Sequence, residues 1–113
     1  MSKIVIALGG NALGMTPSEQ LSILEGVSKV IVDLIEKGNK VILTHGNGPQ
    51  VGQISLAMEY ASNGSAATPP MPFAECGSMS EGYIGYHIEQ SIMNELNKRG
   101  IDKSIVALIT EVL

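Results

Sequence analysis

Two short apolar runs, each ending in a glycine-rich turn, constrain the fold of this chain more than any other feature. Residues 4–8 read Ile-Val-Ile-Ala-Leu and stop at Gly9-Gly10, and residues 41–44 read Val-Ile-Leu-Thr and stop shortly before Gly46. Short runs that are apolar throughout and rich in β-branched residues are typical of strands buried on both faces, as in parallel sheets. We therefore expect two such strands here.

The segment between the two runs carries the signals of one helix. Thr16 is placed as the N-cap, Pro17 occupies the first helical position and Glu19 completes a capping box. Lys37 and Gly38 then supply a basic last turn and a terminating glycine. A strand, a helix and a strand in this order predict a right-handed crossover over residues 3–44. The apolar stripe of this helix is predicted to be Leu24, Val27, Ile31 and Leu34.

The alternation continues through the rest of the chain. A second helix is expected from Pro49 to Asn63, an irregular loop over residues 65–72, a long helix over residues 74–98 and a third strand over residues 105–109. Strands that alternate with helices predict an α/β fold, here a three-layer α/β/α sandwich around a mainly parallel, open sheet. With only three strands, the chain is expected to be the opening part of such a domain.

Composition excludes several classes of protein. The 113 residues contain seven Lys and Arg against eleven Asp and Glu, a formal net charge of −4, which argues against a nucleic-acid partner. The single cysteine, Cys76, excludes an intramolecular disulfide and is expected to be a buried small apolar side chain. Because neither a membrane-spanning run nor a signal-peptide pattern is present, we expect a cytoplasmic protein without a membrane partner.

Glycines gather where the two expected strands meet their helices. Six of the 13 glycines lie there, and each group includes an asparagine, Asn11 or Asn47. Ligands of open parallel sheets bind at the carboxyl ends of strands, where glycine lets backbone N–H groups approach an anion and the following helix adds its dipole. A single junction of this kind would be explained better by a tight turn than by a ligand site. Two such junctions, each with an asparagine, favour an anion site. The glycines are Gly9, Gly10 and Gly14 at the first junction, and Gly46, Gly48 and Gly52 at the second.

The common nucleotide-binding motifs do not account for these loops. The chain has no G-x-x-x-x-G-K-[ST] sequence, and the second junction misses the G-x-G-x-x-G spacing by one residue. Neither loop contains Lys, Arg, Asp or Glu. A phosphate held here would be bound by backbone dipoles and asparagine amides, and charge neutralisation and metal ligation would come from elsewhere.

Three further blocks are informative: residues 6–12, residues 44–52, and residues 71–72 with 76–86. In sequence and in their order along the chain, these blocks closely resemble carbamate kinases of the amino acid kinase superfamily. Many relatives in that superfamily carry a lysine two residues before the first of the paired glycines, where it meets the transferred phosphoryl group. This chain has Ala7 at that position, as carbamate kinases do, which favours carbamate kinase within the superfamily.

The resemblance implies reversible phosphoryl transfer between carbamoyl phosphate and ADP, giving ATP and carbamate, with Mg²⁺ as cofactor. Such a transfer depends mainly on positioning and electrostatics. The family's catalytic lysines and nucleotide pocket are expected beyond Leu113, so no catalytic residue is assigned here. Residues 1–113 would form the N-terminal part of the carbamate- and phosphoryl-binding half and be inactive alone. By resemblance, the phosphoryl group would be cradled by Gly9, Gly10 and Asn11, and the carbamate end enclosed by Gly46, Asn47 and Gly48.

Two histidines need separate interpretation. His45 opens the second glycine loop, where an orienting role is favoured over acid–base chemistry, because transfer from carbamoyl phosphate needs no proton abstraction. His87 lies among apolar residues of the third helix, where packing or an interface is favoured over ligand binding.

The third helix has three glycines, each costing about 1 kcal/mol relative to alanine, a cost that close approach of another backbone would offset. That backbone belongs either to the chain's own sheet or to a partner. The resemblance implies a homodimer through residues 77–98. An apolar stripe beside the glycines is predicted to contain Met79, Tyr83, Tyr86 and Met93.

Two alternatives to carbamate kinase stay open. The chain is then either part of another acyl-phosphate-forming kinase of the superfamily or a non-catalytic module that binds anions or dimerises. The sequence decides neither the physiological direction of the reaction nor whether it serves arginine breakdown or another pathway.

Overall fold

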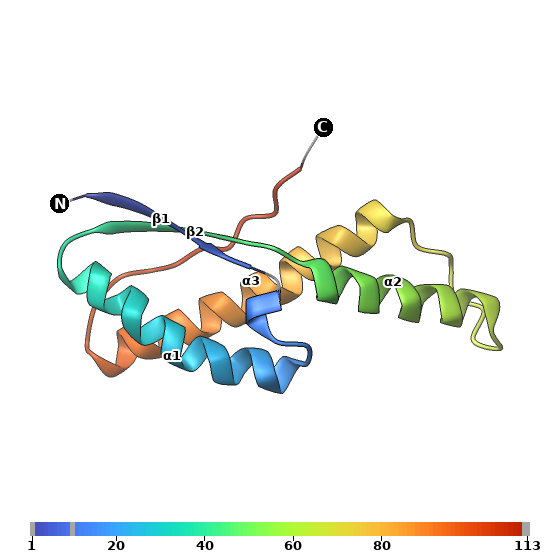
Figure 1. Ribbon diagram of the computed structural model, residues 1–113, viewed down its shortest axis with the longest axis horizontal. Helices are drawn as coiled ribbons and strands as arrows, with labels where there is room; N and C mark the ends of the chain where they lie inside the picture. Colours follow the sequence, from blue (N-terminus) through green and yellow to red (C-terminus); the bar gives the residue numbers. More distant parts are fainter. Residues whose placement is uncertain (1, 10, 112–113) are drawn as a thin grey trace.

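The computed structural model describes residues 2–9 and 11–111, which form a mixed α/β fold and confirm the predicted class (Figure 1). Strands β1 and β2 lie side by side along one side of the molecule, α1 and α3 pack on the other, and α2 extends beyond the strands. The elements, in order, are β1 (Lys3–Leu8), the short 3₁₀ helix η1 (Asn11–Leu13), α1 (Pro17–Glu36), β2 (Lys40–His45), α2 (Gly48–Asn63) and α3 (Phe73–Lys98).

Strands β1 and β2 are parallel, and α1 connects them as the sequence predicts. Each residue of β1 pairs with one residue of β2, from Lys3 opposite Lys40 to Leu8 opposite His45. The N-terminal cap of α1 is also confirmed, because the Thr16 hydroxyl accepts a hydrogen bond from the backbone N–H of Glu19 at 3.2 Å. The strand–helix–strand unit is thus fixed by local signals.

The two strands bury one face only, so the prediction that both faces are covered is wrong for the described residues. Exposure alternates along each strand, and Val5 and Ile42 remain 65% and 53% exposed. The physical reason is that α1 and α3 pack on the same face while α2 continues past the end of the sheet (Figure 1). A pleated strand turns alternate side chains to opposite faces, and here only one face meets helices. The described residues therefore contain two of the three predicted layers.

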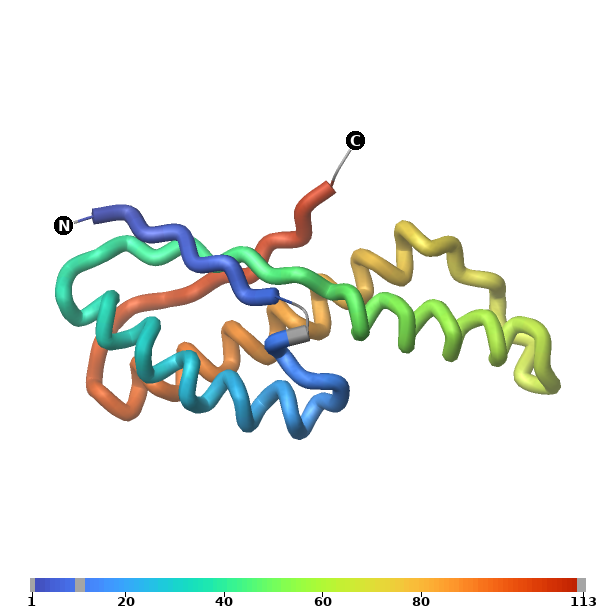
Figure 2. The backbone as a smooth tube through the Cα atoms, viewed as in Figure 1, coloured from blue at the N-terminus to red at the C-terminus, as the bar shows by residue number. Residues whose placement is uncertain are grey.

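The predicted third strand over residues 105–109 does not form in the described structure, where the sheet contains only β1 and β2. Figure 2 traces the segment as an extended stretch after α3. Thr110 binds α3 through its backbone N–H and its hydroxyl, which donate to Glu81 Oε1 at 3.2 and 2.9 Å. A cavity of about 620 Å³ is lined by β2, α3 and this segment. Within the described residues no strand pairs with this segment, so its backbone lacks the ladder hydrogen bonds that define a strand.

The core lies between α1, α3 and the covered face of the strands. Its position corrects the prediction for the third helix, where the apolar stripe was expected at Met79, Tyr83, Tyr86 and Met93. Tyr86 is 63% exposed, and the other three are only half-buried. Apolar residues occupy two adjoining faces of α3, and the packing of α1 decides which face is covered. The fully or nearly buried apolar residues of α3 are Cys76, Ile84, Ile88, Ile92 and Leu96.

Cys76 and His87 are both buried, as the sequence predicts. The His87 Nδ1 lies 2.8 Å from the side-chain oxygen of Gln20 on α1. Because a carboxamide oxygen only accepts, Nδ1 carries the proton of this bond. The ring of Tyr83 meets His87 edge-on, with centroids 5.1 Å apart. His87 therefore packs α3 against α1.

We expect folding stability to decrease in acid because of His87. Burial lowers the pKa of His87 below its ordinary value. The unfolded chain therefore takes up a proton near pH 6.5 that the folded chain resists, so the stabilisation present above this pH is lost as the pH falls toward the folded pKa. Urea unfolding at pH 7.5 and 5.5 should show a steeper loss for the parent than for His87→Gln. An equal loss of stability between the two pH values in the parent and in His87→Gln would contradict the prediction.

None of the helices in the described ranges combines the length and the apolarity needed to cross a lipid bilayer.

Candidate functional site

The parallel register places the two glycine loops at the same edge of the sheet. Leu8 and His45 are paired as the last residues of β1 and β2, and the Gly46 N–H donates to the Leu8 carbonyl at 2.8 Å. Gly9 and Gly46 therefore leave the sheet next to each other. This is the arrangement in which parallel sheets bind ligands. Gly10 and the side chain of Asn11, both predicted site residues, lie outside the described residues.

The first loop turns tightly back toward the core. The Ala12 N–H donates to the Gly9 carbonyl at 3.1 Å, and Leu13 is then fully buried. Gly14 has a φ of +80°, and a Cβ there would lie 2.9 Å from the Cβ of Glu19. Gly14 is thus required by the turn itself. At Gly9, in contrast, an added Cβ would meet no atom of the described residues within 4 Å.

The second loop is two residues long and leads directly into α2. The His45 Nδ1 lies 3.0 Å from the Gly46 carbonyl oxygen. Because that oxygen only accepts, Nδ1 carries the proton and the imidazole is oriented by its own backbone. The orienting role of His45 stays a prediction.

The amino end of α2 has no side-chain cap. Asn47 occupies the N-cap position, yet its side chain makes no capping hydrogen bond. It instead donates from Nδ2 to the Ser80 hydroxyl on α3 at 2.8 Å. Gly48 is exposed, and among the part of the chain that the structure describes an added Cβ there would meet nothing within 4 Å. Helix geometry leaves first-turn N–H groups without acceptors, so open space, unfilled donors and the positive dipole end coincide at this point.

Two glutamines of α2 hold the first loop against the second. Gln50 Nε2 donates to the Gly14 carbonyl at 3.0 Å, and Gln53 Nε2 donates to the Met15 carbonyl at 3.1 Å. Gln50 is almost fully buried, and within the described residues its Oε1 has no hydrogen-bond partner. These contacts fix the distance between the loops.

Sequence reasoning missed Ser80, Gln50 and Gln53. Their partners lie 33 to 38 positions away. No local spacing pattern reports a contact of that range, although Gln50 and Ser80 lie within the blocks that resemble carbamate kinases.

The described residues do not fit a magnesium site. They contain no group of three or more His, Cys, Asp or Glu side chains that could hold a metal. The loops themselves present only backbone groups, amides and one imidazole. What the arrangement can do is bind an anion through N–H dipoles.

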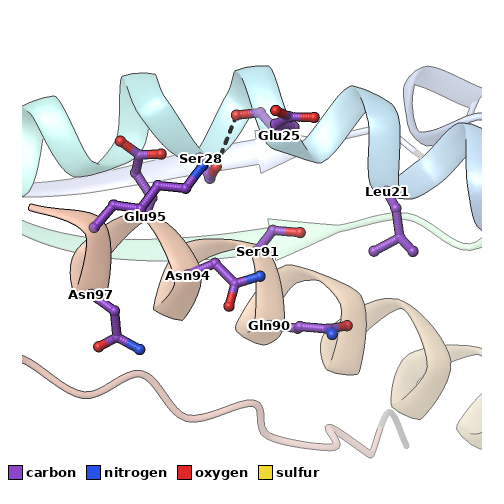
Figure 3. Close-up of a pocket in the computed structure, with 9 residues that line it drawn as sticks. Leu21, Glu25, Ser28, Gln90, Ser91, Asn94, Glu95 and Asn97 are labelled. Atoms are coloured by element: carbon purple, nitrogen blue, oxygen red, sulfur yellow. Dashed lines mark hydrogen bonds between the residues drawn. The ribbon is translucent and has the colours of Figure 1, made fainter.

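A groove between α1 and α3 is separate from this site. It has a volume of about 630 Å³ and is lined by residues of the two helices alone. Figure 3 shows the residues that line it, Leu21 and several polar side chains, and the Ser28 hydroxyl donates to the Glu25 carbonyl at 3.0 Å. It shares no residue with the glycine loops.

Comparison with known proteins identifies the family. The model of the amino acid kinase family matches residues 2–111. The chain is 55% identical over 112 residues to carbamate kinase 3 of Staphylococcus aureus (strain USA300) and 54% identical to the carbamate kinase of Staphylococcus haemolyticus, covering 99% of this chain. It spans about a third of these relatives, 36% of their length.

Solved structures show the same similarity. Carbamate kinase from Giardia lamblia bound to AMP-PNP superimposes with a TM-score of 0.78 and 38% identity, over 88% of this chain and 35% of that protein. A crystal structure from Aeropyrum pernix K1 gives a TM-score of 0.82 and 33% identity, over 96% of this chain and 35% of that protein. The sequence comparison and the Giardia lamblia structure thus both show similarity to carbamate kinases.

Proposed function

The chain belongs to the amino acid kinase family, and we propose that it forms the phosphoryl- and carbamate-binding part of a carbamate kinase. The proposed reaction is reversible phosphoryl transfer between carbamoyl phosphate and ADP, giving ATP and carbamate. The observation that carries this proposal is the pair of adjacent glycine loops, with the uncapped amino end of α2 beside them. The 55% identity to a Staphylococcus aureus carbamate kinase favours this family member over others.

In this proposal the loops act by binding and orienting the substrate. Backbone N–H groups at an open helix terminus stabilise the charge that spreads over the phosphoryl oxygens during transfer. Their positions are fixed before the substrate arrives, because Gln50 and Gln53 bridge the loops. The proposed contacts to the phosphoryl group are made by Gly9, Gly10 and Asn11, and those to the carbamate by Gly46, Asn47 and Gly48.

ATP and ADP are proposed as the nucleotide partners because a Giardia lamblia relative of the same fold binds AMP-PNP. When bound, Mg²⁺ would neutralise phosphate charge. No step is assigned to the metal, since the described residues lack a carboxylate cluster for it. We propose that residues 1–113 are the N-terminal part of the substrate-binding half, and that the nucleotide-binding half corresponds to the part of the relatives that this chain does not span.

The test is ATP formation from carbamoyl phosphate and ADP. It compares the 113-residue chain with an extended chain, in which the remaining sequence of Staphylococcus aureus carbamate kinase 3 is joined to residues 1–113. We expect the extended chain to form ATP and the shorter one to be inactive. An extended chain that ignores carbamoyl phosphate but phosphorylates glutamate would instead be another acyl-phosphate-forming kinase. Activity of the 113 residues alone would contradict the proposed division of the site.

The second candidate is a non-catalytic module that binds anions, and the uncapped end of α2 favours it. The two candidates differ in one result. The non-catalytic module would be supported by two results together. Inorganic phosphate would bind the 113-residue chain, and the extended chain would be inactive on every acyl phosphate.

The homodimer through residues 77–98, the cytoplasmic location and a place in arginine metabolism also remain proposals based on the resemblance. A Cβ on Gly85 would lie 3.1 Å from the Cβ of Ala107 in the same chain, so the space beside this glycine is already filled and does not call for a partner. A Cβ added at Gly77 or Gly82 would meet no other described residue within 4 Å, which leaves these two positions open for a partner.

A further inference from the structure

We propose that Ser80 is a positioning residue that keeps Asn47 from capping α2 and thereby keeps the anion site open. This inference rests on the proposed function of the loops. It concerns a residue of α3 that lies outside both loops and is fully buried.

The hydrogen bonds of Ser80 have only one consistent direction. Its hydroxyl lies 2.6 Å from the Gly77 carbonyl and 2.8 Å from Asn47 Nδ2. The carbonyl only accepts, so the hydroxyl donates to it and accepts from Asn47. The amide group of Asn47 is therefore held toward α3.

Without this bond, Asn47 has a competing partner. Asparagine is among the preferred N-cap residues, because its side-chain oxygen accepts a hydrogen bond from the second or third N–H of a helix. The second residue of α2 is Pro49, which has no N–H, so the N–H group available to donate to the Asn47 side-chain oxygen is that of Gln50. In the structure Asn47 makes no such cap. Its φ and ψ of −146° and 15° also depart from the extended conformation typical of an N-cap.

The Asn47 side chain and the substrate anion would therefore compete for the same N–H group at the amino end of α2. A capping Asn47 would occupy the donor that an anion needs at the amino end of α2. Ser80 prevents this in advance, so the substrate does not have to displace the cap. Loss of the Ser80 hydroxyl should therefore weaken substrate binding roughly 2- to 30-fold, the range that typical N-cap contributions correspond to.

The experiment replaces Ser80 with alanine in the extended chain. We expect Ser80→Ala to raise KM for carbamoyl phosphate, to leave KM for ADP unchanged, and to slow hydrogen exchange of the ligand-free Gln50 N–H. Ser80→Thr, which keeps the hydroxyl, should restore KM. Ser78→Ala is the matched control, because Ser78 makes the same bond to the carbonyl three residues earlier in α3, at 2.7 Å, without contacting Asn47.

A lower melting temperature with unchanged KM and unchanged Gln50 exchange would overturn the inference, since Ser80 would then be structural only. If the parent extended chain does not use carbamoyl phosphate, the proposed function fails by itself. The exchange rate of Gln50 still decides the role of Ser80 in that case. Slower exchange in Ser80→Ala supports the inference, and equal exchange contradicts it.

Discussion

Replacing Gly48 with aspartate is expected to lower turnover of carbamoyl phosphate by the extended chain about 10²- to 10³-fold. Two unit charges about 4 Å apart near a protein surface repel by roughly 4 kcal/mol, which corresponds to about three orders of magnitude in rate. Gly48 is the first residue of α2 and has open space around its Cβ position. A carboxylate there would occupy the place proposed for the substrate anion.

The same substitution should not harm folding, which makes it a sharp test. The first turn of α2 contains no acidic residue, and a carboxylate at a helix amino end stabilises a helix by about 0.3–1 kcal/mol. We therefore expect Gly48→Asp to keep or raise the melting temperature while activity falls. A folded variant with parental turnover would exclude the end of α2 from the site.

Two controls separate charge from volume and from location. Gly48→Asn adds a side chain of the same size without charge and should lose less activity than Gly48→Asp. Gly26→Asp adds the same charge in the middle of α1, where an added Cβ also meets nothing within 4 Å. Its turnover should remain near that of the parent.

The largest effect on stability is expected from Leu13→Ala. Leu13 follows the first glycine loop, is fully buried and belongs to the main core cluster. Removing a buried leucine side chain typically costs about 2–5 kcal/mol, because a cavity remains in addition to the lost burial. That loss is a large fraction of the roughly 5–15 kcal/mol that stabilises a typical domain.

Urea unfolding measures this prediction, with Leu56→Ala as the matched control. Leu56 lies on α2 and is 69% exposed, so its truncation should change stability by less than about 0.5 kcal/mol. Similar losses for the two variants would show that Leu13 does not anchor the loop to the core. A large loss for Leu13→Ala alone would show that the glycine loop is secured by the residue that follows it.

Local signals account for the elements that the sequence predicted correctly. The cap at Thr16, the glycine at Gly38 with its φ of +90° and the two β-branched runs act within a few residues. They therefore determine the strand–helix–strand unit wherever the rest of the chain lies. The glycine loops follow for the same reason, because they end those strands and the strands pair in register.

The tertiary structure decided which face of a helix is buried and which residues far apart in the sequence are in contact. Periodicity shows that a helix has an apolar face, but α3 has two such faces, and only the position of α1 buries Ile84 and leaves Tyr86 exposed. Residues 105–109 have the composition of a strand, yet a strand exists only where a partner backbone completes its hydrogen bonds.

The sequence by itself thus determined which residues form the two loops and that the loops meet at one edge of the sheet. Tertiary structure decided how the loops are held, through Ser80, Gln50 and Gln53. The physical reason is the range of the interactions. Turns, caps and strand propensity act between neighbours in the chain, whereas a hydrogen bond between residues more than thirty positions apart exists only after the helices have packed.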